Sequence, residues 1–173
     1  APPAIISIFL GDQLTEIFGQ IELGNATSTR RGGVLDTGAG VLPKLSRDAG
    51  DRNRTSPFAF TGNKFEFRAV SSSQNIALPV ICLNLAVTEA LDHMATSLET
   101  AVAAGQPLEQ AIKALLCSTI KAHKRIVFNG NGYSEEWREE AGRRGLLNLS
   151  DTVDALPQMV SADALATFEK YRV

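Results

Sequence analysis

Three ionisable side chains alternate with phenylalanines in one short, strand-like segment. Lys64, Glu66 and Arg68 occupy every second position, with Phe65 and Phe67 between them. Successive side chains of a β-strand point to opposite faces, so residues two apart lie about 7 Å from each other on one face. We therefore predict a strand with a charged row on one face and an aromatic row on the other.

The charged row combines a metal-binding group with cations. A carboxylate such as Glu66 is a hard oxygen ligand for Mg²⁺ or Mn²⁺. Lys64 and Arg68 can neutralise phosphate or carboxylate oxygens, which phosphoryl transfer requires. Arg52 and Arg54 add a second cationic pair upstream, and guanidinium groups bind such oxygens in a bidentate manner. The row therefore suits an enzyme that handles phosphorylated or carboxylated substrates.

A second interpretation of the same row needs no ligand. Alternating charges on a strand are commonly a solvent-exposed face with weak ion pairs. A charged row is costly to bury unless a partner neutralises it, and such a partner cannot be identified from the sequence pattern. Both interpretations remain open from the pattern alone.

The chain divides into four parts that must position this row. Residues 1–18 begin with an apolar, β-branched run that predicts a buried strand, followed by a helix. Residues 19–50 are rich in Gly, Ser and Thr and predict a flexible loop. Residues 51–70 hold the arginine segment and the charged strand, and residues 71–173 are the helical part.

Helical periodicity dominates the C-terminal part. Apolar residues at steps of three and four predict an amphipathic helix from Ile76 to near Gly105. Pro107 opens a second helix, Ser134 caps a third and Ser161 starts a fourth. Because short strands precede a cluster of about four helices rather than alternating with them, we predict an α+β fold.

Composition argues against several functions. The 173 residues carry a formal net charge of -2, so no basic surface for nucleic acid or an anionic membrane is expected. No uninterrupted apolar run approaches the roughly 20 residues of a membrane span. Two cysteines, Cys82 and Cys117, are too few for a disulfide framework, which suits the reducing cytoplasm.

The string DRNRTSPFAFTGNKFEFR resembles the catalytic domain of glutamine synthetases. In that family an Asn-Arg-Ser/Thr segment precedes a strand of the form basic-x-Glu-x-Arg, and a Pro-led helix containing Leu-Asp follows. The matching positions, in this order, are Asn53-Arg54-Thr55, Lys64 to Arg68, Pro79 and Leu91-Asp92. FNGNGYS is similar to the type III branch, and ALPQMVSADALATFEKY resembles the Leu-Pro turn of the family and the helix after it.

The resemblance implies a role for each matching residue. Glu66 would be a ligand of the metal, Mg²⁺ or Mn²⁺, near the transferred phosphate. Arg68 would bind the glutamate substrate and its acyl phosphate, and Arg54 would contact the phosphates of ATP, so that both arginines act in catalysis. Lys64 stands where the family has an ATP-contacting arginine, a departure because an ammonium group cannot reproduce a bidentate contact.

The implied reaction joins ammonia to glutamate through a γ-glutamyl phosphate formed with ATP. The implied partners are the remainder of the catalytic domain and neighbouring subunits of a homo-oligomeric ring. Other metal ligands of the family precede the matching segment, so we expect the isolated chain to be inactive. The alternative is a stand-alone binding or oligomerisation module that keeps the fold without the chemistry.

Overall fold

The computed structural model describes residues 5–25, 34–35, 45–46, 50–51, 54–69, 73–149 and 151–173. These residues form five short strands, six α-helices and one 3-10 helix, in the order β1 (Ile8–Phe9), α1 (Gly11–Leu23), β2 (Val34–Leu35), β3 (Leu45–Ser46), β4 (Phe58–Phe60), β5 (Phe65–Phe67), α2 (Ala77–Ala103), α3 (Leu108–His123), η1 (Lys124–Ile126), α4 (Glu135–Arg143), α5 (Thr152–Met159) and α6 (Ala162–Tyr171). The predicted α+β class is confirmed.

Three strands form the sheet that carries the charged row. β1 pairs with β4 in parallel and β4 pairs with β5 antiparallel, so β4 is the central strand. On the edge of β1 that faces away from β4, Ile8 forms a parallel bridge with Val127. The backbone N–H of Phe128 donates to the carbonyl oxygen of Ile8 at 3.0 Å. The segment after α3 therefore closes this edge of the sheet.

The sequence predicted β5 but missed the strand beside it. β5 lies within the expected strand, whereas β4 was not predicted. A three-residue run of two phenylalanines around an alanine has no alternation of polar and apolar residues. Its extended form depends on pairing with β1 and β5, which local sequence does not report.

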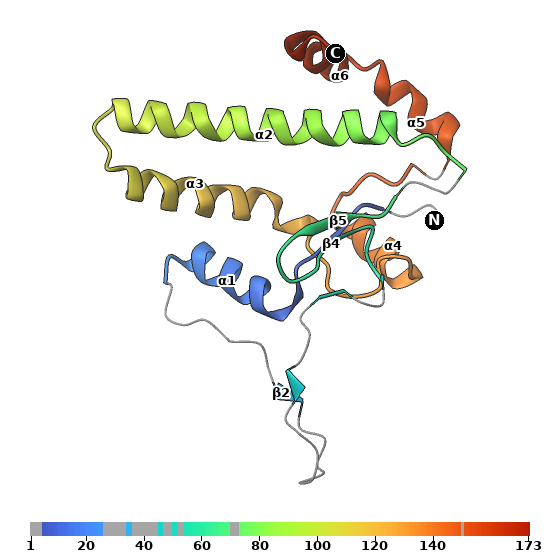
Figure 1. Ribbon diagram of the computed structural model, residues 1–173, viewed down its shortest axis with the longest axis horizontal. Helices are drawn as coiled ribbons and strands as arrows, with labels where there is room; N and C mark the ends of the chain where they lie inside the picture. The colour runs from blue at the N-terminus through green and yellow to red at the C-terminus, as the bar shows by residue number, and fades with distance from the viewer. Residues whose placement is uncertain are drawn as a thin grey trace.

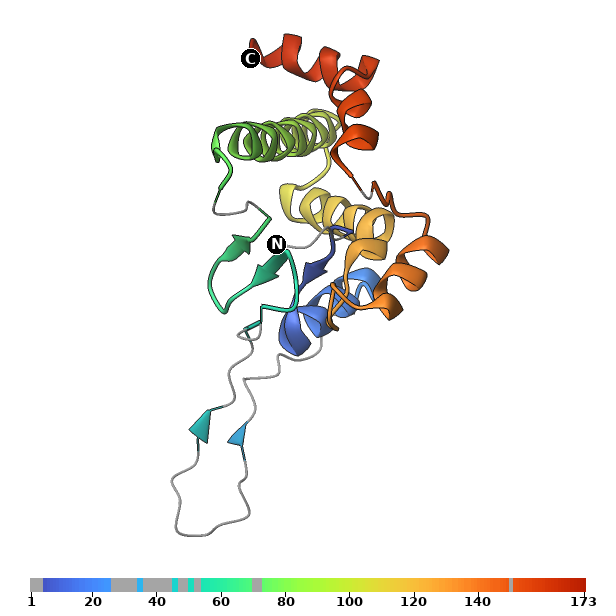
Figure 2. The ribbon, with the colours of Figure 1, turned by 90° about the vertical axis from the view of Figure 1, so that its right-hand side faces the viewer.

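The predicted loop over residues 19–50 begins too early. Helix α1 continues to Leu23 and ends at Gly24, which adopts a left-handed conformation with φ 69°. Further along, β2 and β3 form an antiparallel pair, which lies apart from the three-stranded sheet (Figure 2). Residues 26–33, 36–44 and 47–49 lie outside the described residues, and so does the flexibility predicted for them.

The helices are arranged in layers that extend away from the sheet. α2 and α3 run side by side in opposite directions, and α1 packs on the other side of α3 (Figure 1). α6 lies beyond α2, away from the sheet (Figure 2), and α5 lies beside the N-terminal end of α2 (Figure 1). α3 is therefore the helix that connects the sheet region to the outer helices.

Helix α5 replaces the turn expected around Leu156-Pro157. The carboxylate of Asp151 accepts a hydrogen bond from the backbone N–H of Asp154 at 2.9 Å and caps the helix start. Pro157 lies inside the helix, where its lack of an N–H removes one backbone bond of a short element. The predicted cluster of about four helices therefore lacked this one.

A small core joins β1 to α4. The Trp137 side chain is fully buried, and its Nε1–H donates to the carbonyl oxygen of Ile5 at 3.1 Å. The ring of Phe128 stacks on Trp137 with centroids 4.4 Å apart. Ala141 and Leu146 complete the contact, so the segment after α3 and helix α4 together hold the N-terminal strand.

Asn129 caps α1 from a distant loop. Its Oδ1 accepts hydrogen bonds from the backbone N–H groups of Leu10 and Gly11, both at 3.1 Å, and its Nδ2 donates to Thr15 Oγ1 at 2.9 Å. The helix has no side-chain cap from its own N-cap residue, Leu10. Asn129 therefore satisfies amides that would otherwise lack partners.

Substituting Asn129 is expected to destabilise the chain through α1. Asn129→Ala removes the cap and should lower the free energy of unfolding by about 1 kcal/mol, within the range for lost caps. Urea unfolding followed by circular dichroism measures the change. The matched control is Asn148→Ala, at an exposed loop position, and equal midpoints for the two variants would contradict the capping role.

Helix α2 is long and apolar. It contains an 18-residue window of mean hydropathy 1.2, so by length and composition it is able to cross a membrane, and 6% of that window is buried. Polar residues interrupt the apolar ones along this helix, so it contains no uninterrupted apolar run of membrane-spanning length, and the expectation of no membrane contact stays a prediction. Glu89 and Asp92 lie on α2 and form ion pairs with α6, an arrangement that favours packing against protein because charges are costly inside a bilayer.

Four polar side chains form an ionic cluster between α2 and α6: Glu89, Asp92, Lys170 and Tyr171. Lys170 Nζ lies 2.8 Å from Glu89 Oε2 and 2.7 Å from Asp92 Oδ2. The Tyr171 hydroxyl donates to Glu89 Oε2 at 2.7 Å. No residue of α6 is buried, so α6 lies on the surface, and this ionic cluster links it to α2.

Acid is expected to detach α6. Hydrogen bonds from Lys170 lower the pKa of both Glu89 and Asp92 from their ordinary values of 4.5 and 3.8. A carboxylate with a lowered folded pKa contributes stability that is present above its unfolded pKa and is lost as the pH falls through the folded value. Hydrogen-exchange protection of residues 162–171 should therefore hold down to about pH 5 and decline below about pH 4.

The Glu89→Gln, Asp92→Asn double variant is the control for this acid effect. It should show reduced protection of α6 already at neutral pH and little further loss in acid, because the titrating carboxylates are gone. Equal protection of α6 in the variant and the original chain at neutral pH would contradict the role of the ionic cluster.

Candidate functional site

The sheet separates an aromatic face from a charged face. Strand pairing places the four phenylalanines of β4 and β5 together, and the rings of Phe58 and Phe65 lie 5.4 Å apart. Glu66 pairs with Ala59, so both point to the opposite face. The separation predicted from alternation is confirmed.

Lys64, Glu66 and Arg68 come together on the charged face. Glu66 Oε1 lies 3.0 Å from Lys64 Nζ, and Glu66 Oε2 lies 2.9 Å from Arg68 Nη2 and 3.1 Å from Arg68 Nε. Hydrogen bonds from Lys64 and then Arg68 lower the pKa of Glu66, which stays ionised at neutral pH. Ion pairs of this kind also fit the solvent-exposed interpretation, so the surroundings of Arg68 matter.

Arg68 is anchored from the protein interior by Asp51. The Arg68 side chain is 18% exposed, and its Nη1 lies 3.1 Å from Oδ2 of Asp51, whose side chain is 2% exposed. Arg68 Nη2 also donates to the backbone carbonyl of Asp51 at 3.3 Å. A freely solvated row would lack such a buried partner. Sequence reasoning missed Asp51, although an aspartate a few residues before Thr55 and Ser56 is a typical signal of a side-chain-capped turn.

The same carboxylate organises the loop before β4. Asp51 Oδ1 accepts from the backbone N–H of Thr55 at 3.1 Å and from its hydroxyl at 2.8 Å, and Oδ2 accepts from the N–H of Ser56 at 2.9 Å. Within this turn Arg54 adopts φ 53°, a left-handed conformation that is uncommon outside glycine. Its side chain is exposed, whereas Arg52 lies outside the described residues.

The loop rests on β1 and on the glycine-rich segment after α3. The buried hydroxyl of Ser56 donates to the carbonyl oxygen of Ser7 at 3.3 Å and to that of Phe58 at 2.9 Å. The N–H of Gly132 donates to the carbonyl oxygen of Thr55 at 2.7 Å. The position of this loop before β4, the arginine loop (Asp51 and residues 54–57), therefore depends on residues far apart in the chain.

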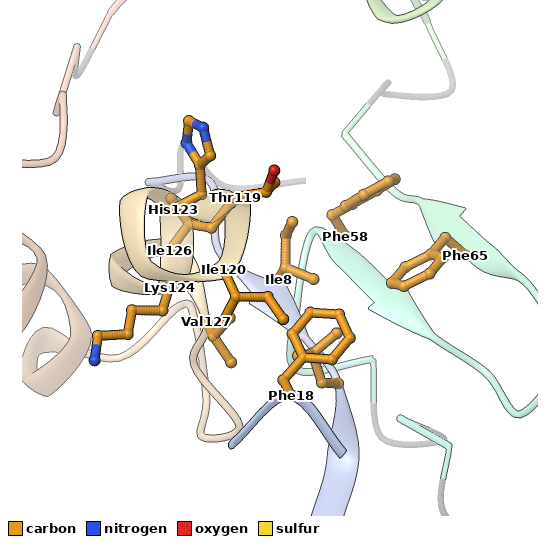
Figure 3. Close-up of a pocket in the computed structure, with 11 residues that line it drawn as sticks. Ile8, Phe18, Phe58, Phe65, Thr119, Ile120, His123, Lys124, Ile126 and Val127 are labelled. Atoms are coloured by element: carbon orange, nitrogen blue, oxygen red, sulfur yellow. The ribbon is translucent and has the colours of Figure 1, made fainter. Parts of the chain in front are cut away.

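The aromatic face borders an apolar cavity of about 200 Å³ between the sheet, α1 and α3. Figure 3 shows Ile8, Phe18 and Ile120 directed toward one another, with Phe58 and Phe65 opposite them. The polar ends of His123 and Lys124 point away from this cluster (Figure 3). The polar groups do not converge on this cavity, so the charged face is the candidate functional site.

The charged face can contribute to a metal site without completing one. Mg²⁺ requires about six oxygen ligands, and the described part of the chain contains no group of three or more His, Cys, Asp or Glu residues that would hold a metal ion. Glu66 has a partly exposed, ionised carboxylate that fits one such position. Asp51 does not fit, because four hydrogen bonds already occupy its buried carboxylate.

Known proteins provide an independent test of the resemblance. Residues 111–173 match the family model of the glutamine synthetase C-terminal domain. The chain is 45% identical over 160 residues to a glutamine synthetase of Bacteroides fragilis (strain YCH46) and 44% identical over 177 residues to a type-3 glutamine synthetase of Dictyostelium discoideum. The predicted glutamine synthetase resemblance is confirmed.

These similarities cover different parts of the chain. The glutamine synthetase family model covers residues from α3 to α6, whereas the Dictyostelium discoideum alignment spans 100% of the chain and so includes the charged face. A glutamine synthetase of Butyrivibrio fibrisolvens is 39% identical over 180 residues. The three alignments cover 90 to 100% of this chain but only 22 to 24% of the relatives. The chain thus matches a segment of a glutamine synthetase, which is a ligase.

Adding a methyl group at Gly132 is expected to disturb the arginine loop. A Cβ there would lie 3.0 Å from Ser7 Oγ and 3.1 Å from the Thr55 carbonyl oxygen, so Gly132→Ala should destabilise the chain by about 1 to 3 kcal/mol through crowding. Thermal unfolding measures this change. Gly142→Ala is the control, because its Cβ would meet open space in helix α4; it should stabilise by about 0.5 to 1 kcal/mol. Equal effects would contradict the proposed close packing.

Proposed function

We propose that this chain acts as a segment of an ATP-dependent glutamate–ammonia ligase of the type III branch, with the charged face at its active site. The observation that carries the proposal is the Glu66–Arg68 pair. It holds a carboxylate suited to a metal and a guanidinium suited to oxyanions 2.9 Å apart on a partly exposed surface. The alignments with glutamine synthetases support the assignment of this pair to ligase chemistry.

Each residue of the charged face has a distinct proposed role. Glu66 would donate one oxygen to Mg²⁺ or Mn²⁺, and the bound metal would neutralise phosphate charge. Arg68 would bind the glutamate substrate and then its acyl phosphate. Arg54 would contact the phosphates of ATP from the adjoining loop, and Lys64 would add a single positive charge for ATP rather than a bidentate contact.

The proposed reaction has two steps. A γ-carboxylate oxygen of glutamate attacks the terminal phosphorus of ATP, and ADP leaves with the bonding electron pair. Ammonia then attacks the carbonyl carbon, phosphate leaves, and the nitrogen loses a proton. Negative charge accumulates on the transferred phosphoryl group in both steps, so fixed cations such as Arg68 lower the barrier by stabilising it.

A binding or oligomerisation module is the second candidate function. The exposed apolar surface of α2, with 6% of its 18-residue apolar window buried, favours this alternative because such surfaces commonly contact other proteins. The two functions differ in whether the charged face needs further metal ligands from the rest of the polypeptide. A ligase requires further metal ligands encoded in frame with this segment, whereas a module does not.

Substitution of Glu66 tests the ligase. In the full-length polypeptide that contains this segment, Glu66→Gln should lower kcat/KM about 100-fold and raise the Mg²⁺ concentration needed for half-maximal rate, because a neutral amide is a weaker ligand for a hard cation. Glutamine formation from glutamate, ammonium and ATP is the assay. The chain of residues 1–173 alone should show no activity in it.

The control for this substitution is Glu109→Gln. Glu109 is an exposed glutamate on α3 whose carboxylate lies 3.0 Å from Lys113 Nζ, so it loses the same charge and the same kind of ion pair. It should retain full activity. An active Glu66→Gln enzyme with an unchanged Mg²⁺ requirement would exclude Glu66 as a metal ligand.

A further inference from the structure

We infer that Asp51 is a positioning residue of the proposed active site. It keeps Arg68 in place while Glu66 binds another cation or gives way to a substrate oxyanion. The inference rests on the proposed function, and it concerns a residue that sequence reasoning did not single out. With a side chain only 2% exposed, Asp51 cannot reach a ligand. It acts through the guanidinium of Arg68.

The hydrogen bonds of Arg68 divide between an inner and an outer partner. A guanidinium has five N–H groups. Toward the interior, Nη1 and Nη2 donate to Oδ2 and the carbonyl oxygen of Asp51 at 3.1 Å and 3.3 Å. Toward solvent, Nε and Nη2 donate to Glu66 Oε2 at 3.1 Å and 2.9 Å. The outer edge of the guanidinium is the edge suited to a substrate carboxylate or phosphate.

This division allows Glu66 to move without losing Arg68. When Glu66 binds another cation or gives way to a substrate oxyanion, it releases the Nε edge of Arg68. The buried contacts to Asp51 then hold the guanidinium with its free edge facing outward. Without Asp51, the side chain of Arg68 would have no described anchor besides Glu66 and would follow it or rotate freely.

Asp51 is itself fixed, which makes it a suitable anchor. Beyond Arg68, its carboxylate accepts three hydrogen bonds from Thr55 and Ser56, and its carbonyl oxygen accepts one from the N–H of Arg54 at 3.4 Å. One buried carboxylate therefore sets the position of Arg68 and the backbone of the loop that presents Arg54. This arrangement couples the glutamate-binding and ATP-binding groups of the proposed site.

The test is Asp51→Asn in the full-length polypeptide. Asparagine keeps the size of the side chain but loses its charge and one acceptor, so Arg68 is held less firmly. The KM for glutamate should rise at least tenfold, with a smaller rise in the KM for ATP and a smaller change in kcat. A merely destabilised enzyme would lose active molecules and leave KM unchanged, and an unchanged KM for glutamate would overturn the inference.

Chemical modification gives a second readout that does not depend on activity. Phenylglyoxal should modify Arg68 several-fold faster in Asp51→Asn, because the guanidinium becomes more accessible, and peptide mass spectrometry measures the rate. The control is Asp151→Asn, which alters a carboxylate that caps α5 through a 2.9 Å bond to the N–H of Asp154. It should leave both the KM and the modification rate unchanged.

The two readouts separate the possible failures. If the original full-length polypeptide has no ligase activity but Asp51→Asn still accelerates Arg68 modification, the proposed function fails and the anchoring stands. If the ligase is active and both readouts are unchanged, only the Asp51 inference fails. Should Asp51→Asn not fold, Thr55→Val removes a single bond to Asp51 at 2.8 Å and should raise the KM for glutamate about two- to fivefold. Thr55→Ser should restore it, and equal KM values for these two variants would overturn the inference.

Discussion

The ion pair between Asp51 and Arg68 is the interaction on which the charged face depends. A carboxylate withdrawn from water is costly unless hydrogen bonds and an opposite charge compensate for it. Here the compensation comes from both sides, because the loop before β4 donates three hydrogen bonds and the end of β5 donates the guanidinium. The ion pair thereby adds a side-chain link at the charged surface to the backbone hydrogen bond from the Arg68 N–H to the Pro57 carbonyl oxygen at 2.7 Å.

The support for this interaction extends across the chain. The segment after α3 pairs with β1 through Val127, caps α1 through Asn129 and contacts the arginine loop through Gly132. Trp137 of α4 then holds the segment before β1 through the carbonyl oxygen of Ile5. The region that matches the glutamine synthetase C-terminal domain is therefore also the region that seats the charged face, although the row itself lies outside it.

The ion pairs of Lys170 and of Arg68 differ in burial, and this difference determines how firmly each holds its partner. Lys170 pairs with Glu89 and Asp92 on an exposed surface, where solvent screens the charges and the pairing is readily reversible. Arg68 pairs with a carboxylate that is almost fully buried, where loss of either partner would leave an uncompensated charge. The first contact suits the docking of an outer helix, and the second suits a fixed geometry at the charged face.

The sequence by itself determined the features that repeat over a few residues. Alternation of period two revealed β5 and its two faces, steps of three and four revealed α2, and the ordered motifs around Arg54 and Glu66 revealed the resemblance to glutamine synthetases. Tertiary structure alone decided the existence of β4, the continuation of a helix through Pro157, the cap that Asn129 supplies across 119 residues and the anchoring of Arg68 by Asp51. The reason is that periodicity reports which face of an element is apolar, whereas the partner of a buried polar group is chosen by packing between segments that are distant in the chain.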